Sequence, residues 1–385
     1  MTRTLAALSE YHIDFSLWQP HSPDSPSSQQ FVAAIRRAAS GLGFFYLHNS
    51  PLSDPTRRAK MFDLVHRFFA LPIETRKQID MAKSRHFRGF CQFGDETTLY
   101  KQDMRDQVDY GPYSESAFFT DPELLTKFPY LNLLGPNQFL DDEVLEGHAA
   151  IVTDWFNQST ETCRQLTTAL EAALGVEKGR LLKFLDGEGG GVVDVCGQGA
   201  LPYARMKTIR YPVGDIVDGI EREKGSEQGV GAHKDSGWMT LLSPSEVAGL
   251  EVQDFDGNWL PVEYIEGAIV FNFGQQVEYV TRGLFQAATH RVVSRVDAQE
   301  TRFSVAWFAL PALNVKMEPL EEAEIDGEVR NIWTSARQGQ DIVCDVPKGD
   351  MFPKKEEEHG MVAWRTFLRS HKQVAEAWYP DAISK

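Results

Sequence analysis

The spacing of hydrophobic and polar positions changes near residue 200 and divides the chain into a helical first half and a β-rich second half. Before that point, apolar residues recur at intervals of three and four, as they do on one face of an α-helix. This spacing predicts helices over 29–43, 54–72 and 141–176, and a buried strand over 43–49. Gly175 marks the expected end of the longest helix, because glycine commonly terminates helices. Residues 84–140 are rich in predicted loops.

After residue 200, short alternating runs are separated by turn sequences such as DFDGNW. Six of these runs are predicted as strands: 204–212, 238–244, 249–254, 267–274, 288–294 and 302–310. Many short strands at this spacing indicate an all-β barrel or jelly roll rather than βαβ units. A last helix is expected over 362–379.

These changes suggest four regions along the chain. We expect an N-terminal region of helices, short strands and a substrate loop, then a long helix with a connector, a β core and a C-terminal extension, over 1–140, 141–199, 200–312 and 313–385. The glycine-rich run 187–191 is interpreted as a flexible connector. It lacks the flanking strand and helix of a phosphate-binding loop.

Composition narrows the choice of partners. The formal net charge is −16, and such a surface repels phosphate backbones and anionic lipids, so neither nucleic acid nor membrane is expected. No stretch reaches the roughly 20 apolar residues of a membrane helix. The apolar run near the N-terminus is too short for the core of a signal peptide. The 4 cysteines are scattered, which favours a reducing, cytoplasmic compartment. The partner we expect is a small-molecule substrate; the oligomeric state is left open.

Three residues have the character of a metal site. His233 and Asp235 form an HxD pair that we expect to face one way on a strand, although such a pair alone is more often a capped turn with a surface histidine. His290, at the start of a later strand, supplies a third ligand. Two histidines and one carboxylate leave about three positions open on an octahedral ion, as in non-haem Fe(II) enzymes. A zinc enzyme is an alternative, but its helical HExxH motif is absent.

Arg302 and Ser304 share one face of the strand that follows His290. The planar guanidinium of Arg302 suits a carboxylate, and the hydroxyl of Ser304 adds a donor. Taken alone, the pair is more often an ordinary surface cation and a buried strand serine. Tyr211, which precedes a proline, has packing as its alternative role.

With these motifs in order, the chain resembles the isopenicillin N synthase-like family of Fe(II)/2-oxoglutarate-dependent dioxygenases. The resemblance covers most of the chain, from IDFS and GLGFFYLHN through SRHFRGF to IRYP, GAHKDSGWMTLL, THRVVS and RFSVAWF. It implies a mainly β fold with flanking α-helices, in which a double-stranded β-helix (a cupin-like jelly roll) follows an N-terminal helical region. It also implies two ligand sets: His233, Asp235 and His290 for iron, and Arg302, Ser304 and Tyr211 for the far carboxylate of 2-oxoglutarate.

The implied cofactor is Fe(II), with 2-oxoglutarate and O₂ as co-substrates. The implied reaction is oxidation of an unactivated C–H bond in a small organic molecule, by hydroxylation, desaturation or cyclisation, with succinate and CO₂ as co-products. Two alternatives stay open: a 2-oxoglutarate-independent oxidase of the isopenicillin N synthase type, and a non-catalytic β-barrel that binds a small acid or a protein.

Two residues are candidates for substrate contact. Arg88 occupies a position like the family's arginine–glycine pair, which meets a substrate carboxylate in some members; a structural salt bridge is the alternative. Phe308 follows Arg302 and Ser304 on the inward-facing period of their strand and either lines the pocket or packs in the core.

Other reactive side chains are expected to have no role in the chemistry. His48 and His66 lie in apolar contexts and are interpreted as packing residues, and His359 as part of a solvated acidic loop. Cys91 is interpreted as a buried, idle thiol. Lys234, between the two HxD residues, should point away from the metal.

Overall fold

The structure is a computed structural model that describes residues 11–98, 101–112, 121–187, 201–295, 298–336 and 357–383. Its strands are β1 (His12–Asp14), β2 (Phe44–His48), β3 (Gly89–Cys91), β4 (Thr97–Thr98), β5 (Lys101–Gln102), β6 (Asp106–Tyr110), β7 (Tyr203–Tyr211), β8 (Ile216–Val217), β9 (Ile220–Glu221), β10 (Gln228–His233), β11 (Met239–Pro244), β12 (Leu250–Gln253), β13 (Trp259–Pro261), β14 (Ile269–Phe273), β15 (His290–Val293) and β16 (Arg302–Leu310). Its helices are α1 (Pro26–Ser40), α2 (Pro55–Ala70), α3 (Ile73–Arg76), α4 (Pro122–Lys127), α5 (His148–Leu174), α6 (Leu182–Asp186), α7 (Gln275–Val280), α8 (Gly327–Ala336), α10 (His359–Ser370), α11 (Lys372–Trp378) and α12 (Pro380–Ile383).

Two sheets form the centre of the molecule. Within the described residues, the larger sheet has the order β1-β2-β14-β11-β16-β7-β6-β3 and the smaller one β10-β15-β12-β13. Side chains from both sheets meet in one buried cluster, to which Tyr46 and Ala306 contribute from the larger sheet and Val252 and Val292 from the smaller. This sheet-on-sheet arrangement confirms the predicted jelly-roll core.

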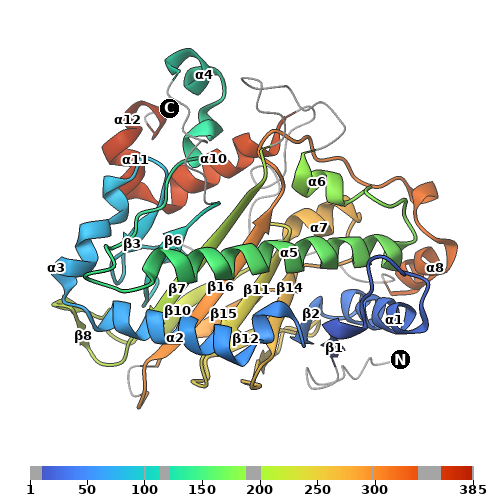
Figure 1. Ribbon diagram of the computed structural model, residues 1–385, viewed down its shortest axis with the longest axis horizontal. Coiled ribbons are helices and arrows are strands. Elements are labelled where there is room, and N and C mark those ends of the chain that lie inside the picture. Colours follow the sequence, from blue (N-terminus) through green and yellow to red (C-terminus); the bar gives the residue numbers. More distant parts are fainter. Residues whose placement is uncertain are drawn as a thin grey trace.

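The other face of the larger sheet is covered by helices. The long helix α5 runs across the sheet, with α1 and α2 nearby (Figure 1). Trp307 of β16 points to this helical side and lies edge-on to Phe156 of α5, with ring centroids 6.0 Å apart. Because side chains alternate along a strand, Ser304 and Ala306 point to the opposite side, between the two sheets. The strand therefore places its arginine and serine in the interior.

The sequence-based prediction of elements was largely confirmed, with shifts at the ends. All six strands predicted after residue 200 are present, as are the three N-terminal helices, although α5 begins only at His148. Gly175 caps α5 with a φ of 68°. The last predicted helix is interrupted at His371, whose φ of −125° and ψ of 65° are not helical.

Other expectations were wrong or incomplete. His359 is not on a solvated acidic loop: it opens α10 with 2% exposure, because its helix packs on the helical turn around Tyr130. The loop-rich stretch 84–140 contains β3 and β6, which extend the larger sheet beyond β7. Residues 188–191 of the glycine-rich run lie outside the described part of the chain. No helix among the described residues is long and apolar enough to cross a membrane.

Candidate active site

The structure brings His233, Asp235 and His290 together at one end of the space between the sheets. His233 ends β10 and lies opposite His290, the first residue of β15. The Oδ1 atom of Asp235 is 3.5 Å from Nε2 of His233 and 3.8 Å from Nε2 of His290. One ligand atom from each residue lies within 4.8 Å of the other two, close enough for all three atoms to bind one metal ion. We call this group the triad end.

The route by which Asp235 reaches this position differs from the expected one. It does not share a strand face with His233, because β10 ends at His233 and Asp235 lies in the turn beyond it. The turn is held by the start of α7, where the Gln275 amide donates to the main-chain oxygen of Asp235 at 2.8 Å. This hydrogen bond fastens the segment that carries Asp235 to α7 and so helps to place its carboxylate.

Two polar side chains that the sequence analysis missed hold the carboxylate itself. The Thr240 hydroxyl and the Asn272 amide both donate to Oδ2 of Asp235, the latter at 2.8 Å. Both are buried, Thr240 on β11 and Asn272 on β14, a strand that is otherwise apolar. A lone polar residue within such a run was the available signal. Because Oδ2 accepts both of these hydrogen bonds, Oδ1 is the oxygen that remains to bind a metal ion.

Hydrogen bonds also fix both imidazoles. Nδ1 of His233 lies 2.8 Å from the Gly231 carbonyl oxygen, and Nδ1 of His290 lies 3.0 Å from that of Ala288. A carbonyl only accepts, so each Nδ1 carries the proton and each Nε2 presents a lone pair. Two such nitrogens and one carboxylate oxygen fit a divalent transition metal such as Fe(II).

The charges at the triad end support one another. Burial alone would raise the pKa of Asp235, but the neighbouring histidines and the Asn272 amide outweigh it and hold that pKa well below its ordinary value. Burial alone would lower the pKa of His233, but the Asp235 carboxylate outweighs it and raises that pKa. Asp235 is therefore ionised at neutral pH, ready to bind a cation. The His233 side chain keeps 32% exposure, so this end remains open on one side.

The other end of the interior is built around Arg302, with Tyr211 directly opposite it on β7 and Ser304 two residues along β16. We call these three residues the arginine end. The Arg302 side chain is buried, and its Nη1 donates to the main-chain oxygen of Val247. Its Nε has no hydrogen-bond partner, and no carboxylate of the described residues forms an ion pair with it. Burial lowers the pKa of Arg302, which is the cost of keeping a cation here without an anion.

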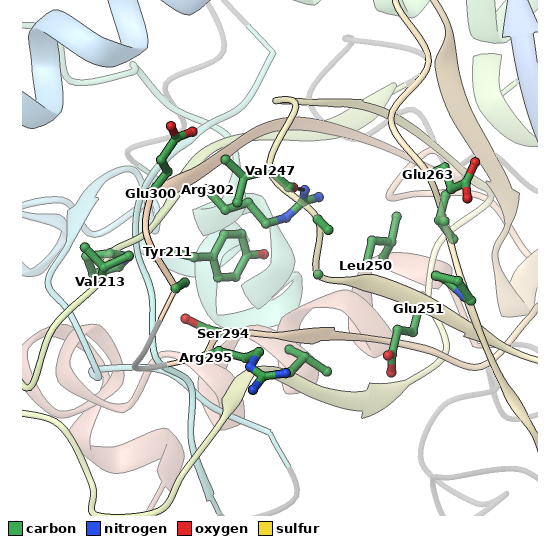
Figure 2. A pocket seen from close by; sticks show the side chains of 17 residues that line it. Tyr211, Val213, Val247, Leu250, Glu251, Glu263, Ser294, Arg295, Glu300 and Arg302 are labelled. Atoms are coloured by element: carbon green, nitrogen blue, oxygen red, sulfur yellow. Dashed lines mark hydrogen bonds between the residues drawn. The ribbon is translucent and has the colours of Figure 1, made fainter.

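A cavity of about 400 Å³ opens at the arginine end. Figure 2 shows Tyr211 and Arg302 side by side, with the hydroxyl and the guanidinium turned to the same part of this cavity. Leu250 and Val262 contribute apolar walls. The triad residues do not line this cavity, so it marks the arginine end alone. The Arg302 guanidinium, the Tyr211 hydroxyl and the apolar walls together match one carboxylate of a small dicarboxylate, while Arg295 and three glutamates also line the cavity.

The two candidate substrate residues occupy different environments. Phe308 faces the interior, half-buried, and packs against the cluster between the sheets. Arg88 is fully buried, and its Nη2 donates to the Leu133 carbonyl oxygen at 3.0 Å and to the Tyr203 hydroxyl at 3.2 Å. The salt bridge considered as its alternative role is not found with any described residue. A substrate contact stays a prediction for both.

The remaining reactive side chains lie apart from the triad. Lys234 turns to Glu278 of α7, with Nζ 3.3 Å from the carboxylate. His48 pairs with His12 at 2.8 Å, and His66 is exposed but packs its ring edge-on to Phe303 at 4.6 Å. Cys91 is a buried free thiol whose pKa is raised by burial.

A second group of possible metal ligands, made of Glu96, Asp109 and His371, is buried beneath the same sheet. The amine of Lys207 already lies among them, 3.1 Å from Glu96 and 3.6 Å from Asp109. A metal ion here would meet that fixed positive charge. The group is therefore an internal ion-pair network rather than a second metal site.

Comparison with known proteins agrees with this geometry. Residues 12–142 match the family described as non-haem dioxygenase in morphine synthesis N-terminal, and residues 206–311 match the 2OG-Fe(II) oxygenase superfamily. The 2-oxoglutarate-dependent dioxygenase frbJ of Dothideomycetidae sp. (strain 11243) is 28% identical over 92% of this chain and 89% of its own length. A 2-oxoglutarate-dependent dioxygenase of Gibberella zeae is 31% identical over 70% of this chain and 65% of its own.

Solved structures show the same fold. The full-length Neurospora crassa protein in complex with alpha-KG and 5-formyluracil superposes with a TM-score of 0.62 at 22% identity, covering 84% of this chain and 95% of its own. A dioxygenase for auxin oxidation from rice gives a TM-score of 0.56 at 22% identity, covering 82% and 88%. The two matched families, the relatives and the site geometry agree: this chain belongs to the isopenicillin N synthase-like family of Fe(II)/2-oxoglutarate-dependent dioxygenases.

Proposed function

We propose that this dioxygenase oxidises an unactivated C–H bond of a small organic molecule at the triad end, while the arginine end holds 2-oxoglutarate. The observation that carries this assignment is that the triad end and the arginine end lie in the same space between the two sheets. Three ligand atoms converge at one end, and at the other end lies a buried cation that pairs with no carboxylate of the described residues. A 2-oxoglutarate molecule has a chelating keto acid and a distant carboxylate, which match these two ends.

Each residue then has a distinct task. His233, Asp235 and His290 would hold Fe(II), which together with bound 2-oxoglutarate supplies the oxidising power and leaves succinate and CO₂ as co-products. Arg302 would pair with the far carboxylate through its planar fork, with donors from Ser304 and Tyr211 beside it. This fixes the co-substrate before the reaction, so that little motion is needed during it.

The substrate side is assigned more coarsely. Phe308 lies on the same strand face as Arg302 and Ser304, opposite Thr240 of β11, and would line the substrate space. Whether hydroxylation, desaturation or cyclisation follows is decided by how the substrate sits there. Arg88 would take part only if its fully buried guanidinium is reached by the substrate.

The deciding experiment measures succinate formed per O₂ consumed by the Fe(II)-loaded protein with a panel of small molecules. We expect one succinate per O₂ and stimulation by the true substrate. Oxygen consumption that does not depend on 2-oxoglutarate would favour the oxidase of the isopenicillin N synthase type instead. The 2-oxoglutarate dependence of the named relatives supports the first outcome. An Asp235→Ala protein serves as the control for metal-independent turnover.

A further inference from the structure

The strand that carries His233 is irregular just before that residue. In its pairing with β15, Gln228 lies opposite Val293, Val230 opposite Val292 and His233 opposite His290, so the register shifts twice within six residues. Such bulges bend a strand, change the aim of the following side chain and leave backbone groups outside the ladder. Something other than β15 must therefore hold this stretch.

The β4–β5 hairpin and the residues that follow it supply that support. The Met104 amide donates to the main-chain oxygen of Gln228 at 2.8 Å. The buried carboxylate of Asp103 accepts from the Gln228 side chain at 3.0 Å and from the main-chain amide of Gly231 at 3.4 Å. Its second oxygen accepts from the Thr98 hydroxyl at 2.8 Å, so Asp103 is itself fixed.

Gly231 connects this support to the metal ligand. Its amide faces Asp103, and its carbonyl oxygen receives Nδ1 of His233 at 2.8 Å. A Cβ atom at Gly231 would lie 2.8 Å from Cγ2 of Thr98, closer than real contacts allow. The absence of a side chain is what lets the hairpin lie against the strand at this point.

We propose that Asp103 is a positioning residue for His233. It holds the bulged end of β10 through the Gly231 amide, and the Gly231 carbonyl in turn fixes the ring and the tautomer of His233. The proposal rests on the proposed role of His233 as a metal ligand. It assigns the β4–β5 hairpin a task in the metal site, although the hairpin contributes no ligand.

The test uses the full-length protein and Mn(II) as the probe, titrated without 2-oxoglutarate. We expect Asp103→Ala to weaken Mn(II) binding by about 10- to 100-fold, the usual range for losing a group that orients a metal ligand. Asp103→Asn, which keeps the shape and one acceptor oxygen, should fall in between. Hydrogen exchange of the Gly231 amide should quicken in both variants.

The matched control is Asp95→Asn. Asp95 is an exposed carboxylate just before the same hairpin, and it accepts hydrogen bonds from the Gln92 amide at 3.2 Å and from the Gln373 side chain. It should leave Mn(II) binding within about twofold. A general loss of stability would lower the melting temperature of a variant without a selective loss of metal affinity.

The outcomes separate the two proposals. If Asp103→Ala folds and binds Mn(II) within twofold of the parent, the positioning role is wrong. If that variant does not fold, Asp103→Asn and Gly231→Ala take its place, and unchanged Mn(II) affinity in both overturns the role. If His233→Ala itself retains Mn(II) affinity, the proposed metal site is wrong, whatever Asp103 does.

Discussion

The two ends of the interior differ in how far the protein satisfies its own polar groups. At the triad end, Asp235 has two donors on one oxygen, and each histidine has a carbonyl partner. At the arginine end, a buried guanidinium has one carbonyl partner, and its Nε has no partner among the described residues. The first end is built in advance for its ligand, whereas the second is costly until an anion arrives. Under the proposed assignment, the same chain uses rigidity to bind a metal and unmet charge to bind a co-substrate.

The largest expected effect comes from removing a ligand at the triad end. His290→Ala should lower 2-oxoglutarate turnover by at least about 1,000-fold, which corresponds to about 4 kcal/mol. The reason is that two remaining ligands hold the metal weakly and in no single geometry. Succinate release and Mn(II) titration would measure this, with circular dichroism as the check on folding. Turnover within tenfold of the parent would contradict the assignment.

At the arginine end, one substitution should move binding and stability in opposite directions. Arg302→Met should weaken 2-oxoglutarate binding by about 10- to 150-fold, since a charge-assisted hydrogen bond contributes about 1.5–3 kcal/mol. The ligand-free protein should become more stable by about 1 kcal/mol, because an unpaired buried cation is removed. Calorimetric titration and thermal melting measure the two effects.

Arg302→Lys is the control, since it keeps the charge and loses the planar fork. We expect its 2-oxoglutarate affinity to lie between those of the parent and Arg302→Met. A methionine variant that is strongly destabilised would mean that the guanidinium is satisfied in the ligand-free protein, and the contrast between the two ends would fail.

A smaller effect on metal affinity should follow from removing one hydrogen bond to the carboxylate of Asp235. Thr240→Val keeps the shape of the side chain and removes its donor to Asp235. Metal affinity should fall by about tenfold, the low end of the usual range for such supporting groups. Affinity for 2-oxoglutarate, measured at saturating metal, should stay within about twofold. Equal losses at both ends would show that they are not independent.

Metal binding at the triad end should also depend on pH. The raised pKa of His233 in the metal-free protein means that protons compete with the metal already above pH 6.5, the ordinary histidine value. Metal affinity should therefore fall as pH is lowered, by up to about tenfold per unit for one proton. The same raised pKa stabilises the metal-free fold. This stabilisation is full below pH 6.5 and is lost as the pH rises through the raised pKa of His233 in the folded protein. Mn(II) titrations at pH 8, 7 and 6 measure the slope.

The smallest effect is expected at the rim of the cavity. Glu251 lines the arginine-end cavity and pairs with Arg291 at 2.6 Å, with both side chains partly exposed. Glu251→Gln should change stability by less than about 1 kcal/mol, as for other surface ion pairs. The KM for 2-oxoglutarate should stay within about twofold. A larger shift would mean that the rim, and not Arg302, governs co-substrate binding.

Sequence periodicity predicted the elements well where a side chain's environment repeats along the element. The strands after residue 200 and the helices packed on the sheet follow such repeats; β15 and β16 were predicted in this way, whereas β10, which carries His233, was not. What escaped prediction depends on single contacts between distant segments: Thr240 and Asn272 on Asp235, and Asp103 on Gly231. Likewise, the helix break at His371 lies within a helical pattern, at a residue whose Nε2 is 3.1 Å from the carboxylate of Glu96 in a distant segment. Such contacts leave no local periodicity to read.

Strand β16 has a consequence for how this enzyme can change over evolution. Trp307 packs against the helical layer, while Arg302 and Ser304 face the interior. Adding or deleting one residue within β16 would therefore turn the interior side chains toward the helices and the helix-facing ones toward the interior. Length changes are therefore confined to the loops at its ends, whereas substitutions at Phe308 stay in register. Under the proposed roles, new substrates would be acquired by varying the loops and Phe308, while Arg302 and Ser304 keep their place as the co-substrate anchor.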